Sequence, residues 1–162
     1  MKSGLKSYIL LIGAATVLSF NSCIKPDQNT IIDQNISIYD LNWSYVNKIK
    51  VDFKIDDAAA TYNLFLNLRV TPSYRYSNIF ILIHQTGPDK KTKTARFEFK
   101  LANPDGEWLG QGTGNLYNYQ VPFEARYKFP TKGIYQIELE QNMRDNPLHD
   151  VSDVGLRVEK AQ

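Results

Sequence analysis

The sequence contains few of the residues on which catalytic and metal sites depend. Its single cysteine, Cys23, has no partner for an internal disulfide. The only histidines, His84 and His149, fit no H-x-x-x-H or H-E-x-x-H spacing, so a structural zinc site has little support. No serine lies in a G-x-S-x-G motif. We therefore expect a protein that is not an enzyme and that uses no metal or small-molecule cofactor.

The apolar run near the N-terminus, residues 8–18, is too short to cross a membrane as a helix, which needs roughly 20 apolar residues. It does have the length of the hydrophobic part of a signal peptide, and Lys2 and Lys6 supply the positive charge that usually precedes it. A small serine directly precedes Cys23. The segment from Phe20 to Cys23 resembles the lipobox of bacterial lipoproteins, although the commoner pattern has Leu at its first position and a small residue at its second.

These features predict how the N-terminus is processed. We expect residues 1–22 to be a cleaved lipoprotein signal peptide, Cys23 to carry covalent lipid with palmitate, and residues 23–35 to form a flexible tether. The tether is polar and contains Pro26, as is typical of a linker. The alternative is that Cys23 is an ordinary free thiol or a small buried residue.

A net charge is absent from the mature chain that this processing would produce. The full sequence has 19 Lys and Arg against 17 Asp and Glu, but Lys2 and Lys6 belong to the signal peptide, which leaves 17 against 17. The charge therefore does not favour nucleic acid as a partner. We expect the protein to be held at the membrane by its acyl chains.

A helical period of 3.6 residues is missing as well, and an alternation of apolar and polar residues takes its place. It is seen in residues 49–55, 62–70, 97–101, 117–129, 135–139 and 154–158. Residues 78–84 are apolar on both faces, which favours a central strand, and Pro122 indicates an edge strand or a bulge. The pattern predicts one all-β domain over residues 36–162, an antiparallel β-sandwich of the jelly-roll or immunoglobulin-like kind.

Glycines and acids occur in groups that could suggest a site. The glycines of residues 106–114 match no phosphate-binding motif and suit a bulged strand or the close approach of another backbone. Paired acids could supply calcium ligands or the two carboxylates of a glycoside hydrolase, but a chain with 17 acids contains such pairs by chance.

Aromatic residues give the more specific hypothesis, because they make up 12% of the chain and several lie beside Asn or Arg. Exposed rings of this kind are typical of protein interfaces and carbohydrate-binding faces. The candidate residues for an interaction or glycan surface are Tyr74, Tyr76, Trp108, Tyr117 and Tyr119. The alternative for each of them is packing in the core of the sandwich.

Several short segments, taken in order, resemble the gliding-motility lipoprotein GldH family of the Bacteroidetes. They are Trp43 to Tyr45, Ile55 and Asp56, Leu68 and Arg69, Tyr74 to Asn78, Gly106 to Gly114, Gln141 to Arg144, and Asp153 to Leu156. The resemblance runs from the signal peptide to the last predicted strand, although no single segment is diagnostic.

The resemblance implies an outer-membrane lipoprotein required for gliding, in a cell that also uses type IX secretion. It implies no catalytic residue, and it points to protein partners in the gliding or secretion machinery. In lipoproteins of this bacterial group an acidic run after the cysteine resembles a signal for surface export, and its absence here favours the periplasmic face. A glycan-binding lipoprotein is the alternative function.

Overall fold

A computed structural model describes residues 28–112 and 115–162 and forms a β-sandwich. Its elements are β1 (Thr30–Ser37), the short 3-10 helix η1 (Tyr39–Leu41), β2 (Ile49–Ile55), β3 (Tyr62–Val70), β4 (Asn78–Thr86), β5 (Thr92–Lys100), β6 (Tyr117–Tyr127), β7 (Gly133–Gln141) and β8 (Val151–Lys160). The predicted all-β class is confirmed.

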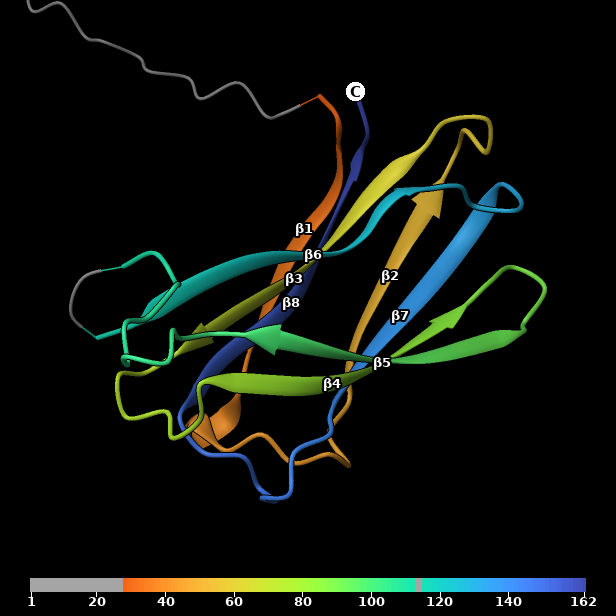
Figure 1. The fold of residues 1–162 in the computed structure, drawn as a ribbon. Helices are drawn as coiled ribbons and strands as arrows, with labels where there is room; N and C mark the ends of the chain where they lie inside the picture. The colour runs from red at the N-terminus through yellow and green to blue at the C-terminus, as the bar shows by residue number, and fades with distance from the viewer. Residues whose placement is uncertain (1–27, 113–114) are drawn as a thin grey trace, which may run out of the picture.

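The strands form two antiparallel sheets of four strands each (Figure 1). Sheet A has the order β1-β8-β3-β6, and sheet B has the order β2-β7-β4-β5. The pairs β1–β8, β2–β7 and β3–β6 are nested around the β4–β5 hairpin, as in one long hairpin folded over on itself. This nesting is that of a jelly roll, so the topology decides between the two sandwich types that the sequence leaves open.

The alternation in the sequence places one face of each sheet in the core. In β2, Val51 and Phe53 are buried, whereas Asp52 and Lys54 between them are exposed. β4 is apolar on both faces and lies between β7 and β5, which confirms its predicted central position. Burial of these inward side chains is the main favourable term in folding.

Pro122 lies in β6, which forms one edge of sheet A. It is opposite Phe65 of β3, and the register between the two strands shifts beside this pair. A proline cannot donate a ladder hydrogen bond, and an edge strand needs such bonds on one side only. The predicted edge position of this segment is confirmed.

The N-terminal boundary of the domain differs from the predicted one. Residues 30–35, which the sequence assigns to the tether, form most of β1, and this strand pairs with β8 along its length. Ile32 and Ile36 pack against the core. The β-domain therefore begins at Thr30 or earlier rather than at residue 36, because two inward isoleucines suffice to hold an otherwise polar edge strand.

Candidate interaction site

The predicted lipid acceptor, Cys23, lies outside the described residues, so its modification stays a prediction. Within residues 28–112 and 115–162, no helix has the length and apolar character needed to cross a bilayer.

Two of the five candidate aromatic residues belong to the core. Tyr74 and Tyr119 are 3% and 7% exposed. The Tyr74 hydroxyl donates a hydrogen bond to the carbonyl of Asn78 at 3.1 Å, and the Tyr119 hydroxyl donates one to the carbonyl of Leu101 at 2.9 Å. Burial raises the pKa of Tyr119 to about 12. Neither ring can present a face to a glycan or to a partner protein.

The other three rings are half-buried and do not lie in one plane. Trp108 stacks on Tyr117 with ring centroids 5.3 Å apart, so each ring covers one face of the other. The ring of Tyr76 is inclined by 73° to that of Tyr74. The Tyr76 hydroxyl donates a hydrogen bond to the carboxylate of Asp145, and this bond raises the pKa of Tyr76. The five candidate residues therefore do not form a flat aromatic platform.

Two glycines of the cluster, Gly110 and Gly112, lie in close contact with neighbouring groups. A Cβ added at Gly110 would lie 2.6 Å from the Tyr119 ring, closer than two carbon atoms can approach. Isolated bridges also join Trp108 to Ala102, which follows β5, and Gln111 to Asn118 of β6. The neighbour at Gly110 is a side chain, whereas a Cβ added at Gly112 would lie 2.3 Å from the carbonyl oxygen of Leu116, so the predicted close approach of another backbone is present at Gly112.

The histidines lie in hydrogen-bonded surface networks. On the outer face of sheet B, the Nε2 atom of His84 and the Nζ atom of Lys48 each lie 2.9 Å from Glu140. Partial burial raises the pKa of Glu140, but its hydrogen bonds with Lys48 and His84 outweigh burial and lower that pKa overall. His149 forms a hydrogen bond with Asn42 in a loop.

The described part of the chain holds no group of three or more His, Cys, Asp or Glu side chains positioned for a metal ion. Of the paired acids, Asp57 binds Lys160 and Asp153 binds Arg69, at 3.0 and 2.8 Å. These carboxylates serve ion pairs between neighbouring segments.

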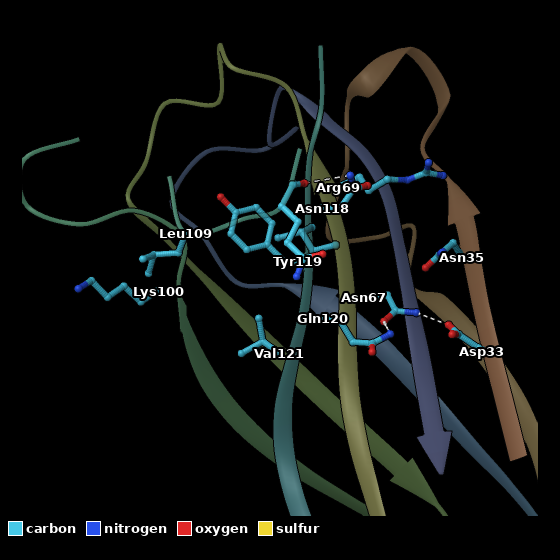
Figure 2. Close-up of a pocket in the computed structure, with 12 residues that line it drawn as sticks. Asp33, Asn35, Asn67, Arg69, Lys100, Leu109, Asn118, Tyr119, Gln120 and Val121 are labelled. Atoms are coloured by element: carbon cyan, nitrogen blue, oxygen red, sulfur yellow. Dashed lines mark hydrogen bonds between the residues drawn. The ribbon is translucent and has the colours of Figure 1, made fainter. Parts of the chain in front are cut away.

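A groove of about 610 Å³ lies beside the outer face of sheet A (Figure 2). Asparagine, glutamine and charged side chains line most of it: Asp33 and Asn35 from β1, Asn67 and Arg69 from β3, and Asn118 and Gln120 from β6. Gly155 of β8 lies between Asn35 and Asn67 in the strand register. A Cβ at Gly155 would lie 1.9 Å from the carbonyl oxygen of Gln34, so the glycine allows β1 to approach β8 closely.

Asn67 is the centre of the polar network in this groove. It is only 6% exposed, donates to Asp33 at 2.7 Å, and accepts a hydrogen bond from Gln120 at 3.0 Å. Figure 2 shows these two bonds crossing the sheet from β1 to β6. A buried amide with both kinds of partner is held in one orientation. The groove thus has fixed polar groups suited to recognition.

Of the five candidate aromatic residues, Tyr119 lines this groove, but the polar residues of the groove were not predicted. Those residues are the outward positions of alternating strands, which the pattern assigns to solvent. The residue types at these positions could have indicated the groove. β3 and β6 carry the amides Asn67, Asn118 and Gln120 where solvent-exposed strands commonly carry charged residues.

Comparison with known proteins identifies similar chains over nearly the whole sequence. A family model described as GldH lipoprotein matches residues 30–158. The chain is 30% identical over 168 residues to the gliding motility lipoprotein GldH homolog of Christiangramia forsetii, and the match covers 99% of both chains. It is 30% identical over 161 residues to the gliding motility lipoprotein GldH of Flavobacterium johnsoniae, covering 95% of this chain and 96% of that one.

Solved structures show weaker similarity. Structures of infectious bursal disease virus, Gx and Gt strains, match with TM-scores of 0.33 and 0.32 and 14% identity. The matches cover 82% and 80% of this chain, which spans about 31% and 30% of those longer chains.

Proposed function

The chain belongs to the GldH lipoprotein family, and from this we propose that it is an envelope lipoprotein required for gliding motility. The observation that carries the proposal is the match to two relatives named gliding motility lipoprotein GldH, or its homolog, over 95% or more of this chain. The match over 99% of the chain includes the segment predicted to be a signal peptide, Cys23 and the whole jelly roll.

At the molecular level we propose a non-enzymatic interaction or assembly module linked to type IX secretion. The described domain supports this because its polar clusters are joined by ion pairs and amide hydrogen bonds between strands, as around Asn67 and Glu140. Such rigid, satisfied networks suit recognition by a preorganised surface.

We place the protein at the outer membrane, held by lipid on Cys23 and facing the periplasm. Stable anchoring needs more than one acyl chain, which a lipidated N-terminal cysteine supplies. The absence of an acidic run after Cys23 supports the periplasmic side.

Deletion of the gene in its own bacterium tests the motility proposal. The deletion strain should fail to spread on agar, and a plasmid copy of the wild-type gene should restore spreading. Secretion of a type IX substrate into the medium should fall in the same strain. Normal spreading by the deletion strain would contradict the motility proposal.

Glycan binding is the second candidate function, and the groove on sheet A favours it more than the aromatic residues do. Its aligned amides can both donate to and accept from hydroxyl groups. Gln120→Ala removes one exposed amide from the groove, so it should abolish binding on a glycan array if this candidate is correct. Equal binding by the wild type and the variant, or none by either, would eliminate it.

A further inference from the structure

One end of the sandwich is built from three loops that hydrogen bonds join together. The connection after η1 contacts the β7–β8 loop through the Tyr45 amide, which donates to the Asn146 side chain at 3.1 Å. The β3–β4 loop joins the same β7–β8 loop through Tyr76 and Asp145. Figure 1 shows η1 and the β7–β8 loop at the end of the sandwich opposite the start of β1 and the C-terminus. This loop end therefore lies at the far end of the sandwich from the start of β1.

A cavity of about 520 Å³ lies at this loop end. The β3–β4 loop and the β7–β8 loop line it together with Phe80 of β4 and Arg96 of β5. Three arginines and one acid line it: Arg75, Arg96, Arg144 and Asp145. The acid is already engaged by the Tyr76 hydroxyl. Its lining therefore has an excess of two positive charges in a mature chain that is neutral as a whole.

Arg96 is held in place by contacts with uncharged groups. Its guanidinium carbon lies 3.9 Å from the centre of the Phe80 ring, and its Nε donates to the Asn142 side chain at 2.7 Å. Within the described residues, its two terminal amino groups have no hydrogen-bond partner and no carboxylate partner. A stacked, hydrogen-bonded guanidinium with an open edge is preorganised to bind a carboxylate.

Arg75 and Arg144 are exposed, and within residues 28–112 and 115–162 neither forms an ion pair. Arg69 and Arg157 of sheet A differ in this respect, because Arg69 binds Asp153 and Arg157 binds Asp33. Three arginines without an ion pair in the described domain thus line one cavity, whose walls also include Phe80 and Met143.

Large exposed apolar side chains lie on the adjoining loop of the same end. Tyr39 is 93% exposed, Val46 is 68% exposed and Tyr45 is 47% exposed. Tyrosine and arginine are the residue types most enriched at the energetic centres of protein interfaces. The loop end therefore carries residues of both types.

We propose that the cavity lined by Arg75, Arg96 and Arg144 binds an acidic segment of a partner protein, with an apolar residue of that segment against Phe80 and Met143. This inference rests on the proposed function as an interaction module and names its binding surface. Membrane phosphates are the less suitable occupant, because the loop end lies opposite the point where the tether enters the fold.

The test uses the full-length lipidated protein in a mild detergent and a rhodamine-labelled peptide with three glutamates on each side of one leucine. Fluorescence anisotropy should show binding that weakens as salt is raised. The double variant Arg75→Glu/Arg144→Glu should lower the affinity at least about tenfold, because each reversal replaces attraction by repulsion. Arg96→Lys keeps the charge and loses the planar fork, so it should weaken binding by several-fold.

The matched control is Lys128→Glu/Lys132→Glu, which reverses two exposed cations in the β6–β7 region. It should leave the affinity unchanged within about twofold. The proposal fails if this control weakens binding as much as the arginine variant does, or if the arginine variant binds like the wild type. Binding of phosphatidylglycerol vesicles that depends on these arginines, with no binding of the peptide, would assign the cavity to a membrane instead.

Circular dichroism checks that each variant is folded. The outcomes are separable from the motility proposal, because peptide binding is measured on the purified protein. A deletion strain that fails to glide, together with an arginine variant that still binds the peptide, would leave the motility proposal standing and remove only this surface.

Discussion

The substitution Gly155→Ala should loosen β1, the strand through which the predicted tether joins the domain. Gly155 in β8 lies between Asn35 of β1 and Asn67 of β3. A Cβ at this position would lie 1.9 Å from the carbonyl oxygen of Gln34 and 2.8 Å from the Cα of Asn35. Since real Cβ atoms do not approach closer than 3.0 Å, β1 must move away by about 1 Å.

The size of the effect follows from the hydrogen bonds of this edge strand. A displacement of about 1 Å lengthens an N–O distance from about 2.9 Å to nearly 4 Å, beyond hydrogen-bond range. Loss of two to four bonds near Gly155, at about 1 kcal/mol each, lowers the free energy of unfolding by about 2–4 kcal/mol. A domain typically has about 5–15 kcal/mol, so the variant should fold with a clearly reduced stability.

Urea unfolding of the full-length protein, followed by fluorescence of the buried Trp43, measures this loss. Hydrogen exchange should show that the amides of β1 lose protection before those of β3. The control is Gly87→Ala, whose added Cβ would have its nearest neighbours at 3.0 and 3.5 Å and should cost less than about 1 kcal/mol. The reasoning is refuted if Gly155→Ala unfolds at the same urea concentration as the wild type or as the control.

Three further predictions concern the anchor, the surface and the core. Cys23→Ser should abolish labelling by radioactive palmitate and release the protein from the membrane fraction, with an unchanged circular dichroism spectrum; retention after a carbonate wash would contradict the tether. The pKa of Glu140 is lowered in the fold, so its contribution to stability is present above its ordinary pKa of 4.5 and is lost as the pH falls through the lower folded value. Urea unfolding at pH 7 and pH 3 should therefore show a larger acid-induced loss for the wild type than for Glu140→Gln, and equal losses would refute the assignment. Tyr119→Phe removes the buried bond to the Leu101 carbonyl and should cost about 1 kcal/mol in the same urea assay, whereas a glycan-contacting ring would leave stability unchanged.

The strands with strong alternation could be predicted from the sequence, because burial of one face is recorded directly in the residue pattern. β2 and β7 are examples, and Pro122 correctly indicated an edge. β1 was placed wrongly, because its outward positions carry Asp33 and Asn35 and only two isoleucines mark its inner face. A strand held mainly by backbone pairing leaves a weak signal in the sequence.

The aromatic residues show that the local sequence pattern does not determine whether a side chain is buried in the fold. Tyr119 shares the parity of Val121 in β6 and is buried, so the prediction of a surface position for it was wrong and the core-packing alternative holds. Tyr74 lies in the β3–β4 loop, where no period applies, and its burial depends on how that loop folds over the end of the sandwich. The arginine cavity is a stronger case, because Arg75 and Arg144 are brought together only by the jelly-roll topology.

That topology also separates the anchored end from the loop end. Seven residues from Cys23 to Thr30 can span at most about 25 Å when fully extended. The ten residues of β8 extend over about 33 Å, so the sandwich is longer than the predicted tether. Turning the loop end onto the membrane would require the start of β1 to stand about 33 Å above the bilayer, which the tether cannot reach. An anchor at Cys23 therefore keeps Arg75 and Arg144 directed away from the membrane that holds the protein, where an acidic segment of another envelope protein can approach them.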